Sequence, residues 1–270
     1  MAGVIGGSHI CGSCSNPTQK AGLLADAGYE ILFSRHDPAG PAQKNAFLRY
    51  NNGPQDVCFL KSTAGLAVEL LDHRSPSELD APYHILLGTP SGAMLIRKKG
   101  FTNSTEQALS EAVGYDVEVY HFPGTGLSYY GPSGPYQASN GLRTIVMECR
   151  NLNESVGFWQ GKMGFRVIKS APSSSLQWCL LRIKSIFPVW SPELLLVQTG
   201  IEPMTAYIDD RGWTCFSLLV TRIDRMLDRL SAAGAAEIGE PFILQRDGKP
   251  VRLCFLRGPD REIVELVEIG

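Results

Sequence analysis

The sequence predicts an α+β fold, built from repeated units of one strand, one helix and three further strands in two tandem halves. A hairpin sequence occurs twice, at residues 56–72 and 252–268. Each copy has a Cys-Phe-Leu run, a short turn and an apolar run with a glutamate, Glu69 or Glu265, eleven positions after the cysteine. Because sheets copied in this way tend to enclose a cavity where they meet, these carboxylates are the first candidates for chemistry.

Four helices are predicted from their capping residues. Each candidate start has an N-cap type residue with a polar partner three positions later: Asn16 with Gln19, Ser104 with Gln107, Asn151 with Glu154, and Thr221 with Asp224. Each helix runs into a glycine suited to a left-handed C-cap: Gly28, Gly114, Gly164 and Gly234. The helices therefore recur with similar local signals, as expected of repeated units.

Alternating and apolar runs predict the strands around these helices. The predicted strands are 9–14, 29–34, 46–50, 57–61, 66–71, 144–149, 166–169, 176–183, 193–197, 215–220, 241–244, 252–257 and 263–267. The second quarter of the chain is irregular. We expect an N-terminal half at 1–125, a linker rich in Gly, Pro, Ser and Tyr at 126–140, and a C-terminal half at 141–270.

Composition excludes several functional classes. The chain of 270 residues is 44% hydrophobic and 19% charged, which is typical of a globular protein. Residues 1–138 hold 9 basic and 12 acidic side chains and residues 139–270 hold 16 and 15, so no basic surface for nucleic acid is expected. No basic residue precedes Lys20 and no apolar run is long enough to span a membrane, so we expect neither a signal peptide nor a membrane partner.

The seven cysteines are odd in number and mostly embedded in apolar strand runs. This pattern favours reduced, buried thiols over a disulfide framework, and hence a cytoplasmic protein. Cys11 and Cys14 form a Cys-x-x-Cys sequence just before a predicted helix, where a low-pKa redox thiol would sit. Two strand-end cysteines without redox function are the competing interpretation.

Residues 142–165 and 255–268 carry a resemblance to a known family. The first segment is similar to the opening strand and helix of a vicinal oxygen chelate module, with its Gly-Phe ending, and the second to the closing glutamate-bearing hairpin. That superfamily includes glyoxalase, bleomycin-resistance and extradiol-dioxygenase type proteins. The resemblance implies paired βαβββ modules, whose curved mixed sheets form a cup for a small organic molecule.

The resemblance also implies a metal site. In that family a histidine or glutamine on a module's first strand and a glutamate on its last strand hold a divalent metal, and two modules complete the site. Matching positions here are His9 and Glu69, with His84 as a candidate third ligand, for zinc, nickel, manganese or iron. The first-strand positions of the later modules are Thr144 and Cys215. Because all five histidines precede residue 122, an iron extradiol dioxygenase is disfavoured.

Glu265 and Glu69 are the candidate catalytic residues. Each shares a strand face with apolar neighbours, so an unpaired carboxylate there would be costly. One alternative is a purely structural carboxylate paired with arginine, for which Arg143 and Arg252 are candidates at Glu265. The same arginines are candidate ligand contacts in a functional site.

Three further residues are candidates for ligand binding. Trp178 and Trp213 fall on or near strands that would form the inner face of the cup, and Cys215 is expected to line it. Cys215 lacks a histidine in its half to act as a base, so a nucleophilic role is not predicted.

The sequence therefore leads to two functional hypotheses. The first is a lyase, isomerase or epimerase in which a divalent metal or a carboxylate assists proton transfer on a small molecule. The second is a metal-free protein of the bleomycin-resistance type that binds or sequesters its ligand. A metal-free enzyme with Glu265 as general base lies between them. Paired modules can associate within one chain or between two, so a homodimer is compatible with either.

Overall fold

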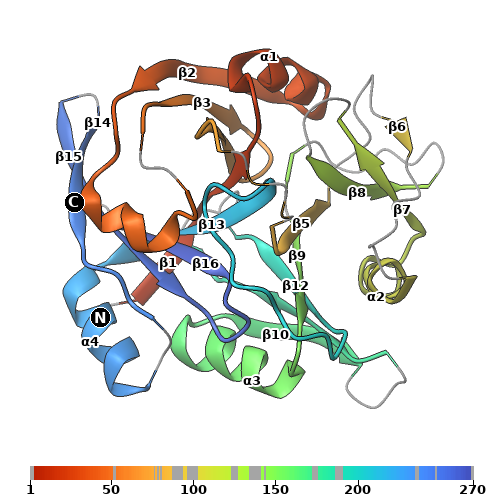
Figure 1. Ribbon diagram of the computed structural model, residues 1–270. Coiled ribbons are helices and arrows are strands. Elements are labelled where there is room, and N and C mark those ends of the chain that lie inside the picture. The colour runs from red at the N-terminus through yellow and green to blue at the C-terminus, as the bar shows by residue number, and fades with distance from the viewer. Residues whose placement is uncertain are drawn as a thin grey trace.

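The computed structural model describes residues 3–50, 53–75, 77, 79, 81–86, 94–95, 103–122, 127–133, 141–142, 144–171, 176–185, 191–234, 237–246 and 248–268. Its strands form one 16-stranded mixed sheet, with helices packed on its faces (Figure 1). The predicted α+β class is confirmed. Within the described residues, no helix has the length and apolar character needed to cross a membrane.

The first and last modules follow the predicted order of strand, helix and three strands. The first contains β1 (Gly3–Ser13), α1 (Pro17–Ala21), η1 (Gly22–Ala27), β2 (Tyr29–Asp37), η2 (Ala42–Phe47), β3 (Gln55–Ser62) and β4 (Ala67–Asp72). The last contains β13 (Gly212–Thr221), α4 (Ile223–Ala232), β14 (Phe242–Arg246), β15 (Lys249–Arg257) and β16 (Ile263–Glu268).

The third module has the same order, whereas the described part of the second has two strands before its helix and two after it. The second contains β5 (Tyr83–Leu86), β6 (Met94–Leu95), α2 (Asn103–Val113), β7 (Val117–His121) and β8 (Ser128–Pro132). The third contains β9 (Thr144–Cys149), α3 (Leu152–Val156) continued by the π-helical η3 (Gly157–Lys162), β10 (Arg166–Ala171), β11 (Trp178–Arg182) and β12 (Glu193–Gln198). Strand β8 lies inside the segment 126–140 that composition predicts as a linker. It pairs with β5 and β7, so strand pairing provides hydrogen-bond partners for its backbone N–H and C=O groups despite the Gly and Pro content.

The modules pair by their first strands. β1 is antiparallel to β13, and β5 is antiparallel to β9. The first module therefore pairs with the last, and the second with the third. In Figure 1 the red and orange strands of the first module accordingly lie beside the blue strands of the last.

The repeated hairpins keep the same register in both copies. Phe59 lies opposite Glu69 between β3 and β4, and Phe255 lies opposite Glu265 between β15 and β16. The last strand of each module also runs parallel to the first: β4 to β1, and β16 to β13. Because β1 and β13 are themselves neighbours, the two glutamate-bearing strands flank a common pair of central strands.

A local side-chain cap explains one of three helix starts. Asn151 accepts hydrogen bonds from the backbone N–H groups of residues 153 and 154, so the predicted cap of α3 is confirmed. Asn16 instead adopts a left-handed conformation without a side-chain cap. The helix α4 begins after Arg222 rather than after Thr221, and the Glu268 carboxylate of β16 accepts from the N–H of Ile223 at 3.1 Å.

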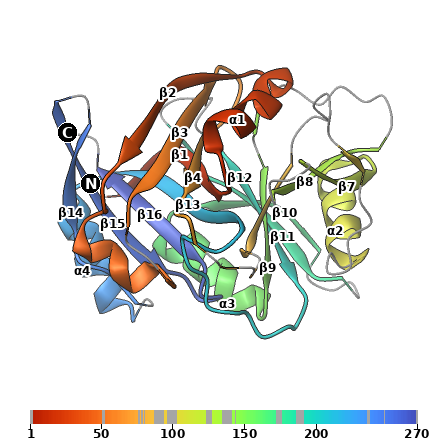
Figure 2. The ribbon, with the colours of Figure 1, turned by 45° about the horizontal axis from the view of Figure 1, so that its top comes forward.

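The second and third modules have a filled cup. Leu195 and Val197 of β12 belong to one buried cluster with Ala108 and Leu109 of α2, while the alternate residues of β12 belong to the cluster that includes α3. The helices α2 and α3 therefore cover opposite faces of this strand. Figure 2 shows α2 at the end of the molecule away from β14 and β15. Side chains of α2 thus take the space that a ligand would need.

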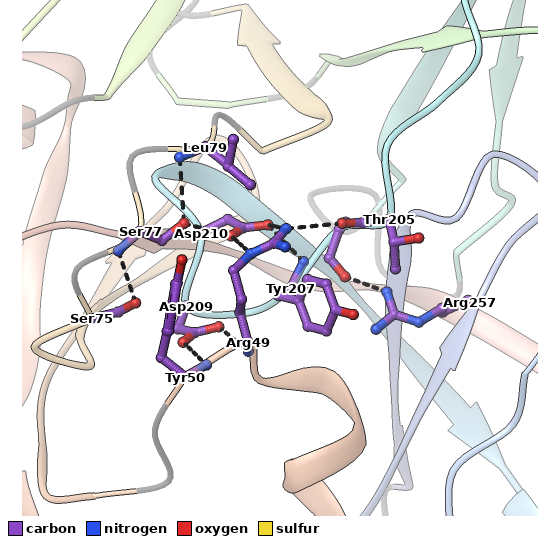
Figure 3. Close-up of polar contacts among 11 residues, drawn as sticks. Arg49, Tyr50, Ser75, Ser77, Leu79, Thr205, Tyr207, Asp209, Asp210 and Arg257 are labelled. Carbon is purple, nitrogen blue, oxygen red and sulfur yellow. Dashed lines mark hydrogen bonds and ion pairs between the residues drawn. The ribbon is translucent and has the colours of Figure 1, made fainter.

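Residues 46–50 do not form the predicted strand. The chain instead makes the 3₁₀ turn η2, which a buried polar network holds against the segment before β13 (Figure 3). Asp209 accepts from the backbone N–H groups of Arg49 and Tyr50 at 2.7 and 3.0 Å. Both oxygens of Asp210 accept from the Arg49 guanidinium at 2.8 and 3.0 Å. Non-local hydrogen bonds, invisible to periodicity, therefore decide the conformation here.

Candidate functional site

The candidate site lies where β1 and β13 pair, inside the cup of the first and last modules. His9 and Cys11 point to the same face of β1 because side chains two apart share a face. Glu69 lies opposite Cys11 across β1 and β4, and Glu265 lies opposite Ser217 across β13 and β16. The two repeated hairpins therefore deliver one carboxylate each to a single imidazole.

The two glutamates converge on one atom of His9. The Nε2 atom of His9 is 3.5 Å from Oε2 of Glu69 and 3.3 Å from Oε2 of Glu265. The Ser217 hydroxyl lies 3.0 Å from the same nitrogen and donates a short hydrogen bond to Glu265 Oε2. On the other side of the ring, Ser8 Oγ is 2.9 Å from Nδ1. These contacts fix the orientation of the imidazole.

The electrostatics of the site favour an ion pair. Burial alone would lower the pKa of His9, but the neighbouring Cys11 and Glu69 outweigh it and raise that pKa well above its ordinary value. Burial opposes ionisation of Glu69, yet the hydrogen bond and charge of His9, together with Arg246, hold the pKa of Glu69 well below its usual range. Both shifts favour the charged forms, an imidazolium beside a carboxylate.

An arginine and two aromatic rings complete the wall beside Glu69. Arg246 of β14 donates from Nη2 to Glu69 Oε1 at 3.1 Å. Its guanidinium carbon lies 5.3 Å from the ring centroid of Phe33 and 5.2 Å from that of Phe59, and these two rings are stacked. Glu69 is therefore held between His9 and Arg246, with one oxygen directed to each.

A partly enclosed cavity contains these groups. Its volume is about 70 Å³, room for about five water molecules when one occupies roughly 10–15 Å³. Apolar side chains make up much of the wall, among them Val57, Leu253 and Phe255. A few polar groups converging in a small, largely apolar cavity are typical of a small-molecule site.

The donor set fits a divalent metal ion. Two ligand atoms bound to zinc at about 2.0–2.1 Å in tetrahedral geometry lie about 3.3 Å apart. The separations from His9 Nε2 to the two carboxylates, 3.5 and 3.3 Å, are close to that value. Ligand atoms of His9, Cys11 and Glu265 also lie within 4.8 Å of one another. Nitrogen, oxygen and sulfur donors together suit zinc best among the common divalent ions.

The thiols near the site are neutral and buried. A hydrogen bond with Cys215, together with burial, raises the pKa of Cys11, and burial raises that of Cys215. Burial also raises the pKa of Cys14 to about 12. A redox thiol needs a lowered pKa, so the Cys-x-x-Cys sequence does not have that character. All seven cysteines are free and buried, as the sequence predicts.

The structure brings together only part of the predicted site. His9, Glu69, Glu265 and Cys215 line the cavity. His84 lies on β5 in the other module pair, where its ring contacts that of Tyr130. It is therefore not a third ligand beside His9, because the modules pair first with last.

The predicted aromatic and arginine contacts lie elsewhere. Trp178 donates to Glu111 of α2 at 2.9 Å, and Trp213 donates to the Ser128 carbonyl at 2.8 Å. Arg252 pairs with Asp224 of α4 and does not contact Glu265, whose partners are Ser217 and His9. Arg143 lies outside the described residues.

Sequence reasoning did not identify Ser217 and Arg246. One signal for Ser217 was available, since it lies six residues before α4, as Cys11 lies six residues before α1. At the same position before α3 stands Val146, opposite Leu195. In the third module, Val146 and Leu195 therefore stand where the last module has Ser217 and Glu265. This apolar pair is consistent with the filled cup of that module.

Comparison with known proteins supports the architecture. No family model matches the sequence, and no curated protein matches it. Glyoxalase I from Zea mays is similar in structure, with a TM-score of 0.61 and 14% identity over 99% of this chain and 92% of that chain. A Bacillus subtilis protein provisionally assigned as a dioxygenase has a TM-score of 0.63 and 10% identity over 99% and 86%. The chain therefore has a glyoxalase-like fold, with paired βαβββ modules.

Proposed function

We propose that this protein binds a small organic molecule in the His9–Glu69–Glu265 cavity and moves a proton on it, as a lyase or isomerase type of enzyme, epimerases included. The observation that supports this most directly is the convergence of two carboxylates on His9 Nε2 within 3.5 Å, inside a partly enclosed cavity. Paired groups of this kind can accept and return a proton at one carbon.

We assign the metal-holding role to His9, Glu69 and Glu265, with the Cys11 thiol beside them. A bound divalent ion would polarise oxygen atoms of the ligand and so acidify an adjacent C–H bond. Binding would also require His9 to lose its proton, so metal uptake is expected to weaken as the pH falls. The ion we expect is zinc, from the mixture of donor atoms.

The two glutamates have different surroundings and therefore different roles. Glu69 is held on both sides, by His9 and by Arg246, and is suited to a fixed charge. Glu265 is held by Ser217, whose hydroxyl can rotate when the carboxylate takes up a proton. We assign Glu265 as the general base. The apolar side chains of the wall lower the local dielectric constant and so strengthen both interactions.

One observation favours the metal-free alternative, a ligand-binding protein of the bleomycin-resistance type. Ser217 and Arg246 already give each carboxylate a partner without a metal ion. In that case the same cavity would bind a ligand without turning it over.

Metal analysis of the whole protein tests the proposal. Wild type, His9→Ala, Glu265→Gln and His36→Ala would be incubated with zinc, dialysed in anion-poor buffer and measured by elemental mass spectrometry. His36 is an exposed histidine paired with Asp56 on the strand pair β2–β3, and so serves as the matched control. We expect about one zinc per chain in wild type and His36→Ala, with at least about tenfold weaker uptake in His9→Ala. Absence of zinc from wild type would reject the metal site.

Proton transfer is tested separately by NMR. Wild type and Glu265→Gln would be incubated in D₂O with small carbonyl compounds, and exchange of the proton next to the carbonyl would be followed. We expect exchange with wild type and a loss of roughly 10²–10⁴-fold with Glu265→Gln. Zinc binding without exchange on any compound would favour the binding-protein alternative.

A further inference from the structure

Lys44 is a buried cation in the wall of the same cavity. It lies on η2, and only 9% of its surface is exposed. It lines the cavity together with His9, Glu69 and Glu265. A lysine stem buried in a cavity wall can carry its ammonium group to the cavity space.

The other charged groups of the described cavity wall are paired. Arg35 Nε lies 2.7 Å from Asp37 Oδ1, and Arg246 contacts Glu69. Glu265 is hydrogen-bonded by Ser217 and lies beside His9. The side-chain amine of Lys44 makes no hydrogen bond or ion pair with the residues that the structure describes. A positive charge in this wall is therefore left for an external anion.

Lys44 shares the cavity wall with the reactive groups. Glu69 and Cys215 line the same cavity, and Lys44 forms no ion pair with Glu69. Gln55, 8% exposed and also in the wall, offers an amide donor to the same space.

From these observations we propose that Lys44, assisted by Gln55, binds the oxyanion of a small organic acid, a carboxylate or a phosphonate. This inference rests on the proposed function, because it takes the cavity to be the ligand site. It adds that the ligand is an anion and small, given a cavity of about 70 Å³. With its anion on Lys44, the rest of the ligand extends toward His9 and Glu265.

Hydrogen bonds to a distant segment hold the turn η2, which carries Lys44. The turn η2 is held at its end by Asp209 and Asp210, which bind Arg49 and the adjacent backbone, and by a hydrogen bond from Ile208 N–H to the Phe47 carbonyl at 2.8 Å. Figure 3 shows this network converging on the segment before β13. A rigid anchor of this kind holds the ammonium in place before the ligand arrives.

Calorimetric titration of the chelator-treated protein tests the proposal without any metal. The probes are pyruvate, its neutral and nearly isosteric amide pyruvamide, and methylphosphonate, in Tris buffer of low ionic strength. The proteins are wild type, Lys44→Met, Lys44→Arg and Lys61→Met. Lys61 is an exposed lysine on β3 and provides the matched control for loss of one positive charge.

We expect wild type and Lys61→Met to bind at least one anionic probe about 10- to 100-fold more tightly than pyruvamide. Lys44→Met should lose this preference, and Lys44→Arg should keep part of it. Tighter binding of pyruvate would indicate a site for a planar carboxylate. Tighter binding of methylphosphonate would indicate a site for a tetrahedral phosphonate. Equal binding of acid and amide by wild type, unchanged binding in Lys44→Met, or no binding of either anion would overturn the proposal.

The test separates this inference from the proposed function. Zinc uptake is measured without an anion, and anion binding is measured without zinc. Anion binding without zinc uptake would reject only the metal site. Zinc uptake without anion binding would reject only the role of Lys44.

Discussion

Glu262 gives the chain a built-in dependence of stability on pH. It lies in the turn between β15 and β16 and is completely buried. Its Oε2 accepts from the backbone N–H of Asp260 at 2.9 Å. Burial, with the nearby Asp260 carboxylate, raises the pKa of Glu262 to about 8, from an ordinary value of 4.5. The folded protein therefore keeps this carboxyl protonated where the unfolded chain does not.

The sign and size of the effect follow from that difference. Between about pH 5 and pH 8 the unfolded chain has lost the Glu262 proton and the folded protein retains it, so the free energy of unfolding falls as pH rises. The stabilisation from this group is fully present below the unfolded pKa and is lost as the pH reaches the folded pKa. The slope is about 1.4 kcal/mol per pH unit, or on the order of 4 kcal/mol over this window.

The substitution Glu262→Gln isolates this contribution, because glutamine is neutral in both states. Urea unfolding of wild type and variant, followed by tryptophan fluorescence at several pH values, gives the difference between their free energies of unfolding. That difference should move in favour of the variant by a few kcal/mol between pH 5 and pH 8. The exposed Glu240→Gln change should show no such trend. A difference for Glu262→Gln that stays constant with pH would refute the reasoning.

Three further substitutions test the packing around the site. Asp210→Ala should destabilise the protein by about 3 kcal/mol in urea unfolding, because it leaves Arg49 without its bidentate partner. Glu268→Gln should cost about 1 kcal/mol by the same assay, through weaker capping of α4 at Ile223. Leu109→Ala should lower stability by about 2–4 kcal/mol yet leave zinc uptake unchanged, because Leu109 fills the other cup.

Each of these expectations has an outcome that contradicts it. The exposed Asp228→Ala change, matched to Asp210→Ala, should cost less than about 0.5 kcal/mol, and equal losses would show that the Figure 3 network is not a specific anchor. An unchanged midpoint for Glu268→Gln would place the cap of α4 elsewhere. Loss of zinc uptake in Leu109→Ala would mean that the two cups are coupled.

Much of the fold could be predicted from local patterns. The repeated hairpin predicted equivalent positions for Glu69 and Glu265, and in the structure each lies opposite the phenylalanine of its hairpin's first strand. Helix signals placed α2, α3 and α4 to within a few residues, since capping and glycine stops act locally. The predicted strand at 46–50 was wrong because Asp209 and Asp210, far along the chain, decide that conformation.

By itself the sequence determined the module and the two carboxylates, since alternation and repeat spacing are properties of the chain, while the resemblance to a known family implied His9 as the partner of Glu69. Only the tertiary structure decided which modules pair. That choice excluded His84 from the site and brought Ser217, Arg246 and Lys44 to it, from strands and a turn that no spacing rule connects. The physical reason is that strand pairing between modules depends on complementary edges and faces across the whole sheet. The helices and strands within one module depend instead on neighbours a few residues away.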